Sequence, residues 1–156
     1  KDTVPMLPRR EASQVILQAE QMLQQGFDDK AIIIRPSGIY GRERLMRVRK
    51  AKEPQKQPIA AGAWANRIMD SDLVTVITKV LTIEEPKPIY IATDYLPVTS
   101  FALTTWLCEQ LGEALPVLDD KNTAISGKRL HSNIPLAWLT YPDWRVGYED
   151  ILRHQD

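Results

Sequence analysis

The amino-acid sequence predicts an α/β fold with a mainly parallel sheet. Two short apolar runs, "AIIIRP" at 31–36 and "IYIAT" at 89–93, are rich in isoleucine and do not alternate with polar residues. Such runs are typical of strands that are covered on both faces. Helical patterns alternate with them along the chain, which favours a layered α/β architecture. Since only these two strands are clear, we expect part of the sheet to lie outside the 156 residues.

Three helices are predicted from apolar residues that recur every three or four positions. The first covers 11–25 and stops at Gly26, the second covers 70–81, and the third covers 97–112. The second helix begins with residues that favour helix starts. Its expected inward face consists of Leu73, Val76, Ile77, Val80 and Leu81.

The remaining segments are shorter. Residues 41–58 are basic and have little core character, and "WANRI" at 64–68 is expected to form a brief strand. Farther on, we expect a short apolar segment "PVL" and then two short helices around the turn "TYPD".

Composition restricts the classes of function. Twenty basic residues balance twenty acidic ones, so net charge gives no reason to expect nucleic acid or an anionic membrane as a partner. One cysteine, Cys108, allows neither a disulfide framework nor a cysteine metal site, which fits the cytoplasm. No apolar run reaches the ~18 residues of a membrane span, and we expect no export signal. The chain begins at Lys1 without Met, which indicates either a start within a longer protein or a tag or removed Met.

An ordered series of motifs resembles the C-terminal half of an extended short-chain dehydrogenase/reductase. More narrowly, the chain is similar to bacterial NAD(P)-binding epimerase/dehydratase-like proteins over nearly its whole length. The series consists of "AEQML", "IIIRPSGIYG" with Arg44, "NRI" with Asp72 and Leu73, "IYIATD", "SGKRLHSN" and "YPDWRVGY".

The resemblance implies a partial Rossmann-like parallel sheet, made of the later strands, plus the small C-terminal substrate domain. We expect 1–156 to form a single unit. Within it, 1–58 would supply later Rossmann elements and a basic loop, and 59–156 the remaining Rossmann elements interleaved with substrate-domain segments.

The cofactor implied by the resemblance is NAD or NADP. The glycine-rich loop that binds the pyrophosphate in such folds is absent from this chain, so the N-terminal half of the parent chain is an expected partner. Backbone groups of Pro36, Ser37 and Gly38 are implied beside the nicotinamide. The alternative is a plain tight turn at a strand end, with proline fixing φ and glycine relieving the turn.

Two functions remain open on this basis. The family's catalytic Tyr and Lys align with Ala12 and Ile16, which transfer no protons, so the chain carries no candidate catalytic residue. The parent protein is therefore either a nucleotide-sugar epimerase/dehydratase-like oxidoreductase or a catalytically inactive dinucleotide-sensing or protein-interaction module. His131 and His154 are too isolated in sequence to indicate a metal site.

An anionic small molecule, and within that class a nucleotide-sugar, is the implied substrate. Arg44 matches a family arginine whose guanidinium suits phosphate or carboxylate. Asn66 and Arg67 precede a helix that closes the substrate pocket in relatives. Lys128 and Arg129 would either reach the same cleft or pin the C-terminal tail by salt bridges.

Other polar and aromatic residues have simpler interpretations. Asp72 is expected to be a charge at a helix N-terminus, and the tyrosines and tryptophans to be packing residues. An uncovered sheet edge predicts self-association into a homo-oligomer. The basic segment has no interleaved aromatics for base stacking, so we expect no nucleic-acid binding. Its solvated side chains are Arg47, Arg49, Lys50, Lys52 and Lys56.

Overall fold

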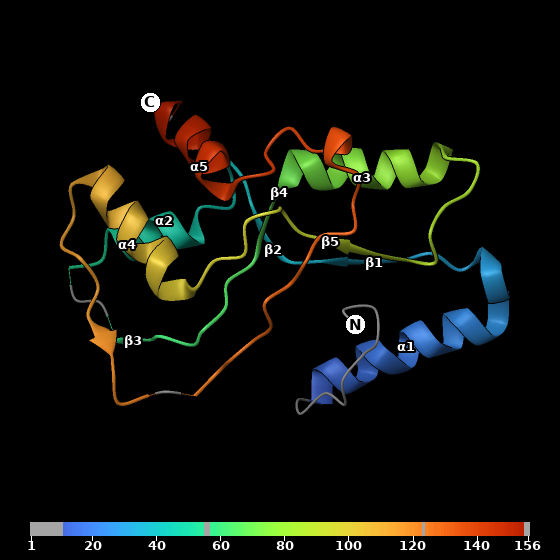
Figure 1. The fold of residues 1–156 in the computed structure, drawn as a ribbon, viewed down its shortest axis with the longest axis horizontal. Coiled ribbons are helices and arrows are strands. Elements are labelled where there is room, and N and C mark those ends of the chain that lie inside the picture. The colour runs from blue at the N-terminus through green and yellow to red at the C-terminus, as the bar shows by residue number, and fades with distance from the viewer. Residues whose placement is uncertain (1–10, 55–56, 123, 155–156) are drawn as a thin grey trace.

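The two isoleucine-rich strands pair in parallel, as predicted. β1 (Ile33–Pro36) lies beside β5 (Ile89–Ala92), with Ile33 opposite Ile89 and Pro36 opposite Ala92. In the computed structural model, which describes residues 11–54, 57–122 and 124–154, α3 lies over these strands and α1 lies on their other side (Figure 1). The predictions for residues 1–10 and Lys56 fall outside the described residues.

The two edges of this sheet differ. On the outer edge of β5, Asn133 takes the place of another strand: its Oδ1 accepts from the Ile91 amide at 2.7 Å, and its Nδ2 donates to the Ile89 carbonyl at 2.9 Å. Within the described residues, β1 pairs with β5 alone. The open edge, where further strands would add, is therefore that of β1.

A second parallel pair continues from the first. β2 (Gly38–Tyr40) lies beside β4 (Arg67–Met69), so the brief strand predicted at "WANRI" is present at its C-terminal end. The chain changes partner at Ser37, whose amide donates to the Ala92 carbonyl at 2.9 Å. The third pair joins β3 (Ile59–Ala60) to β6 (Leu118–Asp119), which includes the end of "PVL".

The predicted helices are present with small differences at their ends. α1 (Glu11–Phe27) continues through Gly26 into a short 3-10 turn, η1 (Asp28–Lys30). α3 (Asp70–Thr82) ends one residue beyond its predicted range, and α4 (Ser100–Leu111) begins three residues later than predicted. Thr99 caps α4 by accepting from the Ala102 amide, and Gly112 ends it with φ of 67°. The two short C-terminal helices are η2 (Leu136–Trp138) and α5 (Trp144–Arg153).

Two hydrophobic clusters form the core. One lies under α3 around Ile68, Val76 and Tyr90, and the other joins α4 and α5 to α2 (Met46–Ala51). The expectation that 41–58 has little core character is wrong for α2, because Val48 and Ala51 are buried. Asp72, expected as a plain helix-end charge, is also buried and accepts from the Thr140 and Tyr141 amides.

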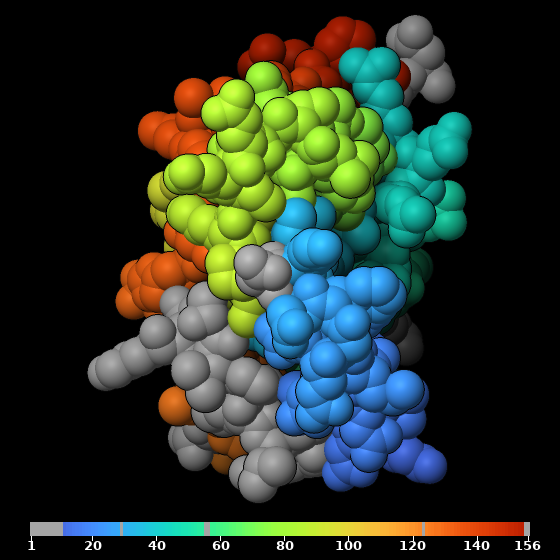
Figure 2. All heavy atoms as spheres, turned by 90° about the vertical axis from the view of Figure 1, so that its right-hand side faces the viewer, coloured from blue at the N-terminus to red at the C-terminus, as the bar shows by residue number. Residues whose placement is uncertain are grey.

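Apolar side chains remain uncovered on two helices. None of the described residues of α1 is buried (Figure 2). On α3, Ile77 is 41% and Leu81 80% exposed, so the prediction that they point inward is wrong for this chain. The exposed apolar side chains of α1 are Val15, Ile16, Met22, Leu23 and Phe27.

An ion pair fastens α1 to β1, and its loss is expected to loosen the helix. Arg35 Nη2 lies 2.6 Å from Glu20 Oε2, and Nε lies 3.0 Å from Oε1. Since none of the described residues of α1 is fully buried, Glu20→Gln should lower the free energy of local opening of 11–27 by about 1–2 kcal/mol. Hydrogen exchange of α1 peptides measures this loss. Glu11→Gln, on the same helix, is the control, and equal acceleration in both variants would contradict the role of the pair.

Candidate functional site

Ser37 lies where β1 and β5 end. Its Oγ is buried and has no hydrogen-bond partner among residues 11–54, 57–122 and 124–154. Buried hydroxyls are normally hydrogen-bonded, and the carboxyl ends of parallel strands are where such folds bind ligands. The unpartnered hydroxyl is therefore unusual for a buried group, and the neighbouring Pro36 is exposed.

Beside Ser37, Gly38 makes room for the guanidinium of Arg67. A Cβ on Gly38 would lie 2.4 Å from Arg67 Nη1, so no other residue fits without displacing this side chain. Arg67 is 6% exposed; its Nε donates to the Ala65 carbonyl at 2.9 Å and its Nη1 to the Gly38 carbonyl at 3.5 Å. Burial lowers the pKa of Arg67. The side chain thus supports the strand ends from inside and is not on the surface.

Asp94 is a second buried charge-bearing group at this edge. It is 1% exposed, its amide donates to the Arg67 carbonyl at 2.7 Å, and its Oδ1 accepts from the Leu96 amide. Burial raises the pKa of Asp94 to about 8, with the charge of Asp143 adding and that of Arg67 opposing. In the sequence, Asp94 is recognisable only as a carboxylate that follows a buried strand.

Tyr40 and Tyr148 stack beneath the same region, with ring centroids 4.3 Å apart. Both are buried, which confirms their interpretation as packing residues, and burial raises the pKa of both hydroxyls. A Cβ on Gly147 would lie 2.0 Å from the Tyr40 hydroxyl, so glycine is needed where α5 crosses this ring. Hydroxyls held protonated in this way do not suit proton transfer at neutral pH.

Asn66 joins the strand ends to the segment that follows Gly127. Its Nδ2 donates to the Lys128 carbonyl at 2.7 Å, and its Oδ1 accepts from the Leu130 amide at 3.0 Å. The side chains of Lys128 and Arg129 are exposed, and the Arg129 guanidinium lies over the Trp64 ring, 5.7 Å from its centroid. The structure thus brings Asn66 to the backbone that carries Lys128 and Arg129, whereas the Arg67 side chain points inward, away from their exposed side chains.

Asn66→Ala is expected to release the segment that follows Gly127 from the strand ends. Both backbone partners lose a hydrogen bond, so we expect the free energy of unfolding to fall by about 1–3 kcal/mol and trypsin to cleave faster at Lys128 and Arg129. Quantified proteolysis and urea unfolding measure the two effects. Asn66→Asp keeps the oxygen that accepts from Leu130 and should be intermediate; unchanged cleavage in Asn66→Ala would refute the tether.

Arg44 lies apart from this group, in the turn after β2, where its amide donates to the Gly41 carbonyl. It lines a cavity of about 380 Å³. Two arginines and three carboxylates border that cavity, so its charge is mixed. The lining residues are Arg42, Glu43, Arg44, Met69, Asp70, Ser71, Tyr141 and Asp150.

Another cavity, of about 340 Å³, opens between α2, β3 and the start of α4. Arg47 and Lys50 line it together with Ser100 and Thr104. The Nε of Arg47 is buried and has no hydrogen-bond partner within the described parts of the chain, so its expected place in a solvated loop is wrong. Sequence reasoning missed this residue because nothing local separates it from the neighbouring basic residues.

The positions aligned with the family's catalytic pair lie on α1. Ala12 and Ile16 are both exposed there, and neither carries an ionisable group. In the described part of the chain there is no group of three or more His, Cys, Asp or Glu that could hold a metal ion. Nor is any described helix long and apolar enough to cross a bilayer.

Comparison with known proteins finds similarity in solved structures. No protein-family model matches the chain, and no curated protein sequence matches it. A candidate NAD-dependent epimerase/dehydratase from Methylobacillus flagellatus superposes with a TM-score of 0.72 at 28% identity, over 96% of this chain and 55% of the other. A protein of unknown function from Silicibacter pomeroyi gives 0.78 at 23% identity, over 97% and 59%.

A more distant match has the same fold. The dTDP-glucose 4,6-dehydratase from Bacillus anthracis, solved in complex with NAD, gives a TM-score of 0.61 at 16% identity, over 96% of this chain and 49% of the other. The chain thus spans about half the length of the structures it matches. Its fold is the mixed α/β fold with small parallel sheets that these proteins share, as the sequence predicted.

Proposed function

We propose that this chain is the C-terminal part of an NAD(P)-dependent, nucleotide-sugar epimerase/dehydratase-like oxidoreductase. In this proposal it contributes the nicotinamide side of the cofactor site and the substrate pocket. The N-terminal half of the parent chain supplies the glycine-rich loop. The parent is a cytoplasmic protein, consistent with its one buried cysteine, Cys108, and its exposed apolar helix faces favour a homo-oligomer.

The observation that carries the proposal is the orphaned Ser37 hydroxyl at the carboxyl end of a sheet whose β1 edge is open. Strands from the missing half would extend the sheet at β1 and bring a cofactor cradle to the same edge. Ser37 and the backbone of Pro36 and Gly38 fit the carboxamide end of a nicotinamide, which needs hydrogen-bonding groups. They do not fit a pyrophosphate, for which the chain has no glycine-rich loop. The cofactor, when bound, supplies hydride transfer.

Several cationic groups support an anionic substrate. Arg47, whose buried Nε has no hydrogen-bond partner among the described residues, and Lys50 border one cavity together with Glu53, beside the N-terminus of α4, where the helix dipole also favours anions. Arg44, Lys128 and Arg129 offer exposed charges for the remainder of the substrate. Asn66 holds the backbone at Lys128, and Arg67 holds the strand end at Gly38.

A chimera tests the cofactor site. This chain is fused behind the part of the Methylobacillus flagellatus protein that it does not match, in place of the matching region, and NADH and NADPH binding is followed by nicotinamide fluorescence. We expect the chimera to bind one of them and Ser37→Ala to weaken binding about three- to tenfold, the value of one hydrogen bond. Thr105→Ala, which removes another buried unpartnered hydroxyl, is the matched control. A folded chimera that binds neither cofactor would overturn the proposal.

A second candidate function rests on Ala12 and Ile16. With no acid/base at these positions, the parent protein would bind the dinucleotide as a sensor or an interaction module without turnover. Incubating the cofactor-bound chimera with a panel of nucleotide-sugars separates the two functions. A change in nicotinamide absorbance supports the oxidoreductase, and binding without any change supports the sensor.

A further inference from the structure

A basic cavity lies between α2 and α5, on residues that the proposed function does not use. Its volume is about 590 Å³, which is in the range of small-molecule sites. None of the proposed cofactor or substrate residues lines it. The lining residues are Arg42, Leu45, Val48, Arg49, Lys52, Ile151 and His154.

The charges around this cavity are not balanced. Three of the seven side chains are cations, a fourth is histidine, and none is acidic. Arg49 lies in the last turn of α2, and Lys52, three residues later, caps the C-terminal end of this helix. Neither side chain has an ion-pair or hydrogen-bond partner in the described part of the chain. Like charges at this spacing repel and destabilise a helix. A bound anion would remove that cost.

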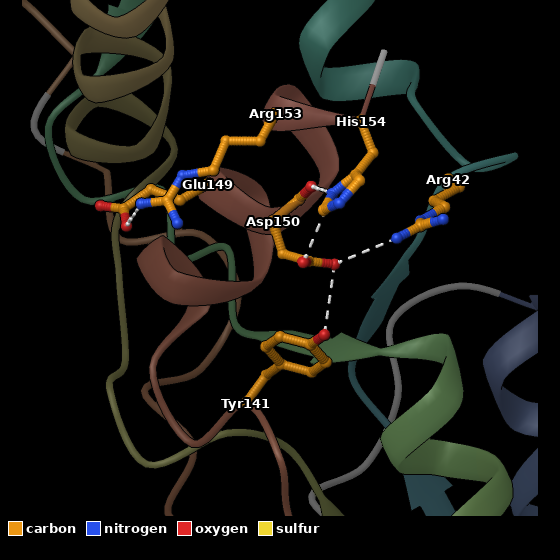
Figure 3. A network of polar contacts seen from close by, with 6 residues as sticks. All are labelled: Arg42, Tyr141, Glu149, Asp150, Arg153 and His154. Atoms are coloured by element: carbon orange, nitrogen blue, oxygen red, sulfur yellow. Dashed lines mark hydrogen bonds and ion pairs between the residues drawn. The ribbon is translucent and has the colours of Figure 1, made fainter. Parts of the chain in front are cut away.

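Asp150 fixes two of the basic groups (Figure 3). Its Oδ2 lies 3.5 Å from Arg42 Nη2 and accepts a hydrogen bond from the Tyr141 hydroxyl at 3.2 Å. The His154 Nδ1 lies 3.6 Å from Asp150 Oδ1 and 2.8 Å from its backbone carbonyl. Arg42 and His154 are therefore positioned before any ligand binds, which reduces the entropy lost on binding.

The rest of the lining is apolar. Leu45 is partly exposed and packs against the core cluster, whereas Val48 and Ile151 belong to that cluster and are 2% and 1% exposed. Leu45 therefore supplies most of the apolar surface that a ligand can reach. Inorganic phosphate has no apolar part that could pack against this surface. A ligand that has an apolar body as well as a negative charge would cover it.

We infer that this cavity binds a phosphorylated small molecule with an apolar or aromatic body. The phosphate pairs with Arg49 and Lys52, and the body lies against Leu45. Arg42 is already paired with Asp150, so these two cations are the ones that favour a phosphate dianion over a singly charged carboxylate. The inference does not depend on cofactor binding or on catalysis.

Calorimetric titration of the 156-residue chain at about 50 mM salt, where screening is moderate, tests it with four probes. Phenyl phosphate carries both the phosphate charge and an aromatic ring. Inorganic phosphate carries the charge without a ring, and phenol carries the ring without the charge. Benzoate carries the ring and a carboxylate in place of the phosphate. We expect saturable binding of phenyl phosphate, at least about tenfold tighter than that of each of the others.

Two double variants locate the site. Arg49→Ala/Lys52→Ala removes two charge-assisted hydrogen bonds and should weaken phenyl phosphate binding more than about tenfold. Lys30→Ala/Lys79→Ala removes the same charge from exposed positions elsewhere and should weaken it less than about twofold. Equal loss in both variants, no saturable binding, or benzoate binding as tightly as phenyl phosphate would overturn the inference. Circular dichroism confirms that both variants are folded.

Discussion

Replacement of Trp144 by Ala is expected to lower the free energy of unfolding by about 3–5 kcal/mol, the usual cost of emptying a buried aromatic site. Trp144 starts α5, has no exposed surface, and packs edge-on against Trp106 with ring centroids 5.2 Å apart. It also contacts Tyr148, which stacks on Tyr40 at the strand ends. Since domains of this size are stable by about 5–15 kcal/mol, urea unfolding should show a large shift of the midpoint.

Two milder variants separate packing from general damage to the helix. Trp144→Phe keeps a ring and removes Nε1, which is buried without a hydrogen-bond partner among the described residues, so its cost should be about 1–2 kcal/mol. Val146→Ala changes a half-exposed residue on the same helix and should cost less than about 0.5 kcal/mol. If Trp144→Ala costs no more than Val146→Ala, this cluster does not hold α5 in place.

The sequence was sufficient for the elements with strong hydrophobic patterns. β1, β5, α3 and α4 were predicted because continuous isoleucine runs and three-to-four residue spacing report burial directly. α2 was missed because six residues make less than two turns, and only Val48 and Ala51 of "MRVRKA" are buried. Periodicity over so short a segment is not distinguishable from a basic loop.

The candidate site was predicted less completely, for a different reason. Ser37 and Gly38 were found because they follow a buried strand, and Asn66 and Arg67 because they resemble a family motif. The inward direction of Arg67 and the burial of Asp94 depend on residues far away in the chain, such as Asp143 and Trp144 near Asp94. The same holds for Arg47, of which the Nε atom is buried. A local pattern does not contain these contacts.

α3 and α1 each carry apolar side chains that this chain leaves uncovered. Both helices carry apolar residues at the spacing of a buried face, yet Leu81 and the apolar side chains of α1 are exposed. An apolar stripe with this period normally packs against a neighbouring element. Matched structures about twice as long as this chain supply a place for one. Under the proposed function, the other half of the parent chain or a second copy would cover the exposed stripes, and strands of that half would pair with the open edge of β1.

Asp94 should make the protein less stable as the pH rises. Its ordinary pKa is 3.8, and burial raises the pKa in the folded chain to about 8. Between these values the folded chain retains a proton that the unfolded chain has released. Stability therefore decreases with rising pH through this window and levels off above about pH 8, with a slope of at most about 1.4 kcal/mol per pH unit.

Asp94→Asn isolates this effect, because the amide has nearly the same shape, keeps an oxygen for the Leu96 amide and does not titrate. Urea unfolding of both proteins at pH 5, 6, 7 and 8 should give curves that diverge as the pH rises, with the variant the more stable one at pH 8. All other titrating groups are common to the two proteins and cancel in the difference. Parallel pH profiles would mean that Asp94 ionises normally in the folded chain. In that case the ionised Asp94 would have to be paired or solvated, since an isolated buried carboxylate is too costly to form.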